Sequence, residues 1–387
     1  MSDPLPPLSR IPPQIACVED YEPVARERMT ANAWAYISGG SGDEATLRRN
    51  RTAFESLCLR GRILADLTGG DTRLNLFGQP FTAPILLAPV AYLKLAHPCG
   101  ELAAVLGATA AETGMILSTH ASAPLEDVIA HGDHRRLWFQ LYPLPDRGAT
   151  LELALRAEAA GYSALVVTLD APVNGMRNRE QRAQFHLPPG VEAVNTRGMV
   201  PAPAYRGGEG RPLCGGILEH ALTWADVGWL KSLTRLPLIL KGVMDAEDAI
   251  RATELGVDGL VVSNHGGRTL DSLPAAIEVL PEIAEGVAGR VPLLLDSGVR
   301  RGTDILKALA LGAKAVLVGR PYVYGLAAAG ASGVAHVSNI LRSELEVAMA
   351  LTGCRNLAAI GPQVLRATRR PSDASSRLRP CVSKCLT

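Results

Sequence analysis

Residues 259–271 read Gly-Leu-Val-Val-Ser-Asn-His-Gly-Gly-Arg-Thr-Leu-Asp. The first four form an apolar run without polar alternation, which is typical of a strand buried on both faces of a parallel sheet. His265 and Arg268 follow where this strand ends and a loop begins. A histidine can accept a proton near neutral pH and an arginine can bind a carboxylate or phosphate, so the loop is a candidate site for a small anion. Alone, such a pair is more often structural, and the rest of the chain decides between the two interpretations.

Seven further apolar runs share this pattern, and each is followed by a helical stretch. The eight predicted strands are Ile85–Ala88, Met115–Ser118, Leu137–Leu141, Ala164–Thr168, Leu238–Lys241, Gly259–Ser263, Val291–Asp296 and Ala315–Gly319. Eight strands alternating with helices predict an α/β fold, the (β/α)8 TIM barrel. Polar or glycine-rich residues end every run, and in such barrels the loops after the strands form the active site.

Three segments depart from the regular repeat. Residues 1–14 are rich in proline and are expected to be a flexible arm, whereas residues 362–387 are basic and polar and are expected to be a disordered tail. Residues 15–361 are expected to form a single domain that begins with an N-terminal helical segment. Within this domain, the insert Leu187–Leu222 between the fourth and fifth strands is rich in proline and glycine, which predicts a long loop or lid.

The charge balance excludes several classes of partner. The 387 residues include 39 basic and 38 acidic side chains, a net charge of +1, so no extended field favours nucleic acid or an anionic membrane. The uncharged window Tyr322–Leu341 reaches the length of a membrane span, but its glycines, serines, asparagine and histidine favour a packed helix. We therefore expect neither a nucleic-acid nor a membrane partner.

Seven cysteines are present, at positions 17, 58, 99, 214, 354, 381 and 385. Their spacing matches no metal-binding motif, and an odd number in a large chain favours reduced thiols. The first 13 residues lack the basic and apolar regions of a secretion signal. We therefore expect a cytoplasmic protein without a metal site.

Two loops are candidates for a phosphate site. Residues 296–302, Asp-Ser-Gly-Val-Arg-Arg-Gly, follow the seventh strand, and Gly319-Arg320 follow the eighth. These loops often bind phosphate in α/β barrels, and here they offer backbone amides and guanidinium groups. No GxGxxG motif follows the first strand, so a dinucleotide bound in the Rossmann manner is not expected.

From about Ile15 to about Gly361, these motifs resemble the FMN-dependent L-2-hydroxy acid oxidase and dehydrogenase family, which includes glycolate oxidase, lactate oxidase, mandelate dehydrogenase and hydroxymandelate oxidase. The resemblance implies FMN as the cofactor and oxidation of an L-2-hydroxy acid to the 2-keto acid. It further implies oxygen as the electron acceptor, with release of hydrogen peroxide. A homo-oligomer, either a tetramer or an octamer, is also implied.

The resemblance also assigns residues to the cofactor. The implied FMN contacts are Ala88, Pro89, Ala91, Ser118, Gln140, Thr168, Lys241, Ser263, Asp296, Gly298, Arg300, Gly319 and Arg320. Among them, Arg300 and Arg320 would bind the phosphate and Asp296 the ribityl hydroxyls. Lys241 ends an apolar strand, where its charge is costly without a negative partner, and the resemblance places it against the reduced flavin ring.

A 2-hydroxy acid requires a clamp for its carboxylate and a base for its proton. The resemblance implies substrate contacts from Tyr36, His120, Tyr142, Arg177 and Arg268. It implies a catalytic group of His265 as base, Asp170 as the residue that orients it, Tyr142 near the substrate hydroxyl, and Lys241. Spacing alone does not distinguish Arg177 from its neighbours Arg179 and Arg182. Removal of the α-hydrogen as a proton and its transfer as hydride both use His265.

Several pocket positions differ from common family members. His120 stands in place of a bulky tryptophan or tyrosine, and Ser297 in place of a frequent glycine. Lactate, longer aliphatic acids and aromatic 2-hydroxy acids therefore all remain possible substrates. Ala91 stands where several poorly oxygen-reactive relatives have glycine, which favours an oxidase. The alternatives are a dehydrogenase that reduces a quinone or cytochrome, and a catalytically inactive barrel that binds FMN.

Overall fold

The eight predicted strands are confirmed, and they close into one barrel. The computed structural model describes residues 4–200, 218 and 221–366. The barrel strands are β4 (Ile85–Leu87), β5 (Gly114–Ser118), β6 (Leu137–Leu141), β7 (Leu165–Thr168), β8 (Leu238–Val243), β9 (Gly259–Val262), β10 (Leu293–Leu295) and β11 (Ala315–Val318). All neighbours pair in parallel, in the order β10-β11-β4-β5-β6-β7-β8-β9. This is the (β/α)8 architecture that the repeated runs predicted.

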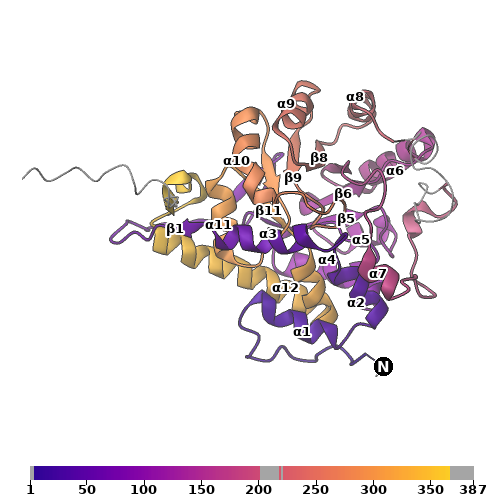
Figure 1. Cartoon of the computed structure of the whole chain (residues 1–387), viewed down its shortest axis with the longest axis horizontal. Coiled ribbons are helices and arrows are strands. Elements are labelled where there is room, and N and C mark those ends of the chain that lie inside the picture. Colours follow the sequence, from indigo (N-terminus) through magenta and orange to yellow (C-terminus); the bar gives the residue numbers. More distant parts are fainter. Residues whose placement is uncertain (1–3, 201–217, 219–220, 367–387) are drawn as a thin grey trace, which may run out of the picture.

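Helices surround this barrel (Figure 1). Those after the strands are α4 (Gly100–Ala110), α5 (Leu125–Ala130), α6 (Arg147–Ala160), α7 (Asn178–Arg182), α8 (Trp224–Leu233), α9 (Ala246–Glu254), α10 (Ala276–Val287), α11 (Gly302–Ala310) and α12 (Arg320–Thr352). The N-terminal segment contributes α1 (Tyr21–Arg26), α2 (Ala31–Ser38) and α3 (Ala45–Glu55). Helix α12 packs against α1, α4 and α11, so the N-terminal segment is part of the same body as the barrel.

The uncharged window Tyr322–Leu341 lies in α12. This helix is interrupted where Ala329 and Gly330 leave helical geometry, and Gly330 has a φ of 57°. The two halves approach so closely that a Cβ on Gly333 would lie 1.9 Å from the carbonyl oxygen of Gly325, which only glycine permits. In the part of the chain that the structure describes, no helix is long and apolar enough to cross a membrane.

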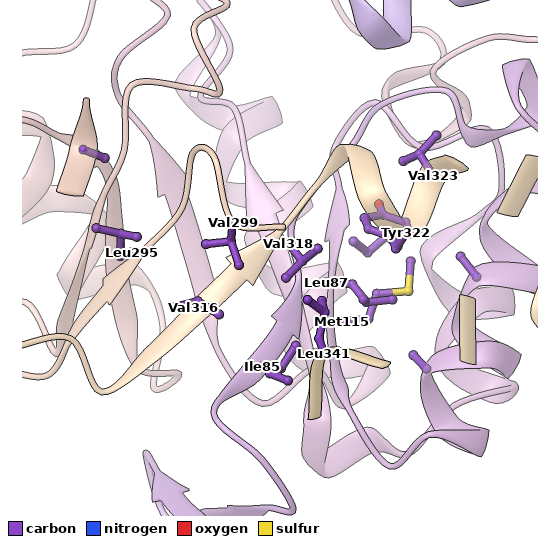
Figure 2. Close-up of a cluster of buried hydrophobic side chains, with 14 of the residues drawn as sticks. Ile85, Leu87, Met115, Leu295, Val299, Val316, Val318, Tyr322, Val323 and Leu341 are labelled. Carbon is purple, nitrogen blue, oxygen red and sulfur yellow. The ribbon is translucent and has the colours of Figure 1, made fainter. Parts of the chain in front are cut away.

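Burial on both faces explains why the strands lack alternating polarity. One face points into the barrel interior, where the packed residues include Leu86, Ile116, Trp138, Val166, Ile239, Val261, Leu294 and Leu317. The other face packs against the helices, and Figure 2 shows Ile85, Leu87, Met115, Val316 and Val318 beside Tyr322 and Leu341 of α12. The barrel is therefore a filled core, and ligands must bind at one of its ends.

A small hairpin covers the amino-terminal end of the barrel. It consists of β2 (Leu74–Leu76) and β3 (Gln79–Phe81). The rings of Phe77 and Phe81 meet the buried ring of Trp138 edge to face, at centroid distances of 5.5 and 6.1 Å. The hairpin packs at this end, and the polar side chains gather at the other.

The disordered tail was predicted to begin at residue 362, which is too early in the chain. Pro362–Val364 form a 3-10 turn, and β12 (Leu365–Arg366) pairs antiparallel with β1 (Cys58–Leu59). The prediction of disorder is therefore wrong for residues 362–366, because the buried side chain of Val364 and the strand pairing hold them on the domain. Residues 367–387 lie outside the described part of the chain.

The predicted arm is likewise attached. The backbone amides of Leu5 and Leu8 donate to the carbonyl oxygens of Glu27 and Ala328, at 2.9 and 2.7 Å. Residues 4–14 form no helix or strand, as expected of an arm, and these two bonds attach the arm to the domain. Its flexibility stays a prediction. Residues 1–3 are not described.

The insert after β7 is a loop over the part described. Val194–Thr196 form a 3-10 turn, and the buried amide of Asn195 accepts a bond from Leu125 N at 2.9 Å and donates to Ala123 O at 3.2 Å. Residues 201–217 and 219–220 lie outside the description.

Candidate active site

The carboxyl ends of the strands surround a cavity of about 850 Å³. Seventeen of the predicted site residues line it: Tyr36, Ala88, Pro89, Ala91, Ser118, His120, Tyr142, Thr168, Arg177, Lys241, His265, Arg268, Asp296, Gly298, Arg300, Gly319 and Arg320. The other three, Gln140, Asp170 and Ser263, hydrogen-bond to lining residues. Residues that are up to 284 positions apart in the chain (36 to 320) thus meet at one end of the barrel.

His265 and Asp170 form a partly buried pair at this end. The Nδ1 atom of His265 lies 2.8 Å from Oδ1 of Asp170, and its Nε2 atom lies 3.4 Å from the hydroxyl of Tyr142. Burial lowers the pKa of His265, although Asp170 opposes the shift. Burial alone would raise the pKa of Asp170, but His265 and Lys241 hold it below its ordinary value. The imidazole is therefore neutral near pH 7 and the carboxylate beside it is charged, the protonation states that a general base and its orienting group require.

Two arginines face the same cavity. The guanidinium group of Arg268 donates to the carbonyl oxygens of Tyr36 and Gly39 and stacks over the Tyr36 ring at 4.9 Å. Arg177 lines the cavity, whereas Arg179 pairs with Glu44. The structure thus distinguishes Arg177, which the resemblance assigns to the substrate, from Arg179. The sequence spacing could not distinguish them.

Glu180 was not predicted. One of its carboxylate oxygens lies 2.9 Å from Nη1 of Arg177 and 3.2 Å from Nη2 of Arg268, so it joins the two arginines. The spacing of Arg177 and Glu180, three residues apart at the start of the short helix α7, was the available sequence signal. Phe185 was also missed; its ring stacks on that of Tyr36 at 4.6 Å. Nothing in the sequence around it marks this contact.

Lys241 has its negative partner within the protein. Its Nζ atom lies 2.9 Å from Oδ2 of Asp296 and donates to the Ser263 hydroxyl at 2.9 Å. Burial opposes the charged amine, but Asp296 and Asp170 outweigh it and raise the pKa of Lys241. A fixed positive charge therefore lies in the cavity wall, where it can stabilise an anion.

Two more arginines lie at the loops after β10 and β11. Among the described residues, neither guanidinium group, that of Arg300 or that of Arg320, forms an ion pair with a carboxylate, although Asp304 accepts a bond from the Arg300 backbone amide at 2.9 Å. Burial lowers the pKa of both, and the charge of Arg268 adds to this effect at Arg320. Buried cations without a counter-ion are costly, and a phosphate would neutralise them.

Two glycines of these loops, Gly298 and Gly319, differ in their surroundings. At Gly319, an added Cβ would meet only Ala88, at 3.9 Å, so the backbone is open toward the cavity. At Gly298, with a φ of 103°, it would lie 2.2 Å from Asn50 O. Glycine is thus required at position 298 both by the left-handed φ and by the close packing against α3.

Several buried polar atoms of the site have no hydrogen-bond partner among the described residues. They are Nε2 of Gln140, Oγ1 of Thr168, Oδ2 of Asp170 and Nε of Arg177. An unpaired buried donor or acceptor is destabilising unless a ligand satisfies it. FMN has a polar ring and a phosphate. The unpaired groups of Gln140 and Thr168 fit the polar ring, and the guanidinium groups of Arg300 and Arg320 fit the phosphate.

Three aromatic rings border another part of the cavity. The ring of His120 stacks between those of Tyr92 and Tyr142, at centroid distances of 6.0 and 5.1 Å. Burial lowers the pKa of His120, so it is uncharged near pH 7. Its neighbours make this part of the wall flat and largely apolar.

Comparison with known proteins identifies the scaffold. The family described as FMN-dependent dehydrogenase matches residues 25–367. The chain belongs to this family. It is therefore an FMN-dependent oxidoreductase, and the cofactor expected from the sequence is confirmed.

Characterised relatives match along nearly the whole chain. An L-lactate oxidase from Nostoc sp. (strain PCC 7120 / SAG 25.82 / UTEX 2576) is 47% identical over 352 residues, 89% of this chain and 96% of the relative. Glycolate oxidase from Spinacia oleracea is 42% identical over 349 residues, 90% and 94% of the two chains. A crystal structure of mandelate oxidase with benzoyl-formic acid superposes with a TM-score of 0.82 at 41% identity, covering 91% of this chain and 98% of that one.

Proposed function

We propose that this protein oxidises an L-2-hydroxy acid to the 2-keto acid and passes the electrons to oxygen, which yields hydrogen peroxide. The observation that carries this proposal is the convergence of a neutral histidine, its carboxylate partner and two arginines on one cavity. Relatives named as lactate, glycolate and mandelate oxidases support it. FMN supplies the redox chemistry, since it accepts an electron pair from the substrate and can release it to oxygen.

The base in this proposal is His265. Its Nδ1–H bond to Asp170 leaves Nε2 free to take a proton from the substrate, and the carboxylate stabilises the imidazolium that forms. The hydroxyl of Tyr142, close to Nε2, would hydrogen-bond to the substrate oxygen. Because burial raises the pKa of Tyr142, it remains a protonated donor.

The clamp consists of Arg177 and Arg268, with Tyr36 beside them. Planar guanidinium groups bind a carboxylate in a bidentate manner and so fix its orientation. Arg268 is held by two backbone carbonyls and by Glu180 before any substrate binds. This pre-organisation would hold the α-carbon of the substrate in one place.

The cofactor site in this proposal follows the chemistry of the donors. Arg300, Arg320 and the backbone at Gly298 and Gly319 would hold the phosphate, and Asp296 the ribityl chain. The unpaired atoms of Gln140 and Thr168, with Ser118, would bind the polar edge of the ring. The remaining proposed contacts are Ala88, Pro89, Ala91, Lys241 and Ser263.

We also propose a homo-oligomer in the cytoplasm. Large apolar side chains are exposed on the loop after β1 and on the C-terminal part of α12: Ile63 (88% exposed), Leu64 (98%), Val347 (58%) and Leu351 (66%). The backbone amide of Arg62 donates to Leu351 O at 2.9 Å, so the loop and the helix form one surface, which association would cover. Light scattering on the purified protein would give the mass of the assembly.

The proposed location in the cytoplasm is supported by the cysteines. Those of the described residues, Cys17, Cys58, Cys99 and Cys354, are all free, which suits a reducing compartment.

An anaerobic bleaching screen tests the proposed reaction. Purified protein is mixed without oxygen with L-lactate, glycolate, longer aliphatic 2-hydroxy acids and L-mandelate, and separately with the D-forms of the chiral acids, and the flavin absorbance is followed. We expect the yellow colour to bleach with at least one L-acid and with none of the D-acids. Flavin that stays oxidised with every acid would leave an inactive FMN-binding barrel. Bleaching followed by reoxidation with a quinone but not with oxygen would identify a dehydrogenase.

A further inference from the structure

The turn that carries His265 has an uncommon backbone. His265, Gly266 and Gly267 all adopt left-handed geometry, with φ of 57°, 64° and 72°. Glycine tolerates this region, whereas a residue with a Cβ is disfavoured there. Such a conformation persists only where surrounding contacts hold it.

Two serine hydroxyls hold the amides of this turn. The Oγ atom of Ser263 accepts from His265 N, and that of Ser297 accepts from Gly266 N, both at 3.0 Å. Ser263 also accepts from Lys241 Nζ at 2.9 Å, and Ser297 donates to Asp296 Oδ1 at 2.7 Å. Successive amides of the turn are therefore connected, through two serines, to the same buried ion pair of Lys241 and Asp296.

Ser297 is itself in the left-handed region. Its φ is 76° and it is 7% exposed. Glycine, which often occupies this position in the family that the sequence resembles, would adopt this φ without strain. A serine here costs conformational energy, and what it adds is the hydroxyl that joins Asp296 to the turn.

We propose that Ser297 is a positioning residue for His265. Its hydroxyl fixes the His265–Gly266 turn to the Lys241–Asp296 pair, so the imidazole stays aligned with Asp170 and with the cavity. This inference rests on the proposed role of His265 as the base. The carboxylate clamp does not depend on it, because Arg268 is held by Tyr36, Gly39 and Glu180.

Three variants separate positioning from stability. Ser297→Ala removes the hydroxyl and keeps the strained φ, whereas Ser297→Gly removes the hydroxyl and relieves the strain. Ala288→Gly is the matched control: Ala288 ends α10 with a left-handed φ of 49° and does not line the cavity, so this change relieves strain outside the site. Each holoenzyme is measured for flavin content, melting temperature, and anaerobic flavin reduction over a range of substrate concentrations.

We expect Ser297→Ala and Ser297→Gly to show the same loss, about tenfold, in the limiting rate of flavin reduction, because a small misalignment of a base slows proton transfer strongly. Substrate dissociation constants should change less than about twofold. Ser297→Gly should melt at a higher temperature than Ser297→Ala, since glycine relieves the strain. Ala288→Gly should reduce its flavin at the wild-type rate.

Two results would overturn the inference. One is a wild-type reduction rate in either Ser297 variant. The other is a rate that recovers together with the melting temperature in Ser297→Gly, which would make the role of Ser297 purely structural. Failure of the wild-type flavin to bleach with any 2-hydroxy acid would instead overturn the proposed function.

Discussion

Replacing Asp170 with asparagine removes the charge that faces His265 and leaves a side chain of the same size. The two groups are 2.8 Å apart and their side chains are only 20% and 9% exposed, so the carboxylate stabilises the imidazolium that forms when the base takes a proton. Two unit charges whose centres are about 4 Å apart interact by about 4 kcal/mol at an effective dielectric constant of about 20. Because the imidazole carries only part of its charge in the transition state, we expect a loss of about 10²- to 10³-fold in the rate of flavin reduction.

The assay is anaerobic stopped flow, which follows flavin absorbance after mixing with a saturating 2-hydroxy acid. The variant should keep its FMN and bind substrate with nearly unchanged affinity, since Asp170 belongs neither to the carboxylate clamp nor to the proposed phosphate site. Glu126→Gln is the control, because Glu126 forms an exposed pair with Arg156 outside the cavity. A reduction rate in Asp170→Asn within about threefold of the wild-type rate would refute the role of this pair.

Four further predictions concern the same site. Arg268→Lys should weaken substrate binding and slow reduction by about tenfold or more each, because one ammonium cannot replace a bidentate clamp; steady-state kinetics with unchanged constants would contradict this. Glu180→Gln removes a negative charge from beside Arg177 and Arg268. Inhibition by oxalate, which carries two negative charges, should therefore strengthen by about tenfold relative to inhibition by propionate, which carries one. An unchanged ratio of the two inhibition constants would show that Glu180 does not act on the clamp. His120→Trp should shift preference toward the shortest acids, because the larger ring fills space between Tyr92 and Tyr142; an unchanged substrate profile would place His120 outside the side-chain pocket. Burial lowers the pKa of His265 below its ordinary 6.5, so the imidazole becomes protonated and stops acting as a base only as the pH falls through that lowered value. The rate of flavin reduction should therefore be constant above pH 7 and decline in acid. A rate that still rises above pH 7 would contradict the lowered pKa.

The barrel was predictable because local pattern determines it, and so was the gathering of polar strand ends at one end of it, whereas residues such as Tyr36 and Arg177 were assigned by the family resemblance. Each strand is a short apolar run buried on both faces, and its polar terminus lies at the same end of the barrel as the other seven. The positions of His265, Lys241 and Asp296 therefore follow from strand order alone. The predicted strand ends differ from the observed ones by up to two residues, since flanking apolar residues such as Val291 extend the pattern beyond the paired segment.

Contacts made across the fold were not predictable. Glu180 reaches Arg268 across 88 positions of sequence, and the Ser297 hydroxyl reaches Gly266 N across 31. A sequence pattern does not reveal such distances, because they depend on how the loops are placed after the barrel closes. The tail was misjudged for a similar reason: Leu365–Arg366 are ordered by pairing with a strand about 300 residues earlier, which composition cannot show.

The most direct test of the central claim is the stoichiometry of one aerobic turnover. With the acid that bleaches the flavin fastest, oxygen consumed, 2-keto acid formed and hydrogen peroxide released are measured in the same sample, with catalase absent. The structure and its relatives predict a ratio of one to one to one. Keto acid formed only when a quinone or cytochrome is added, or formed without an equal amount of peroxide, would contradict the assignment of this protein as an FMN-dependent 2-hydroxy acid oxidase.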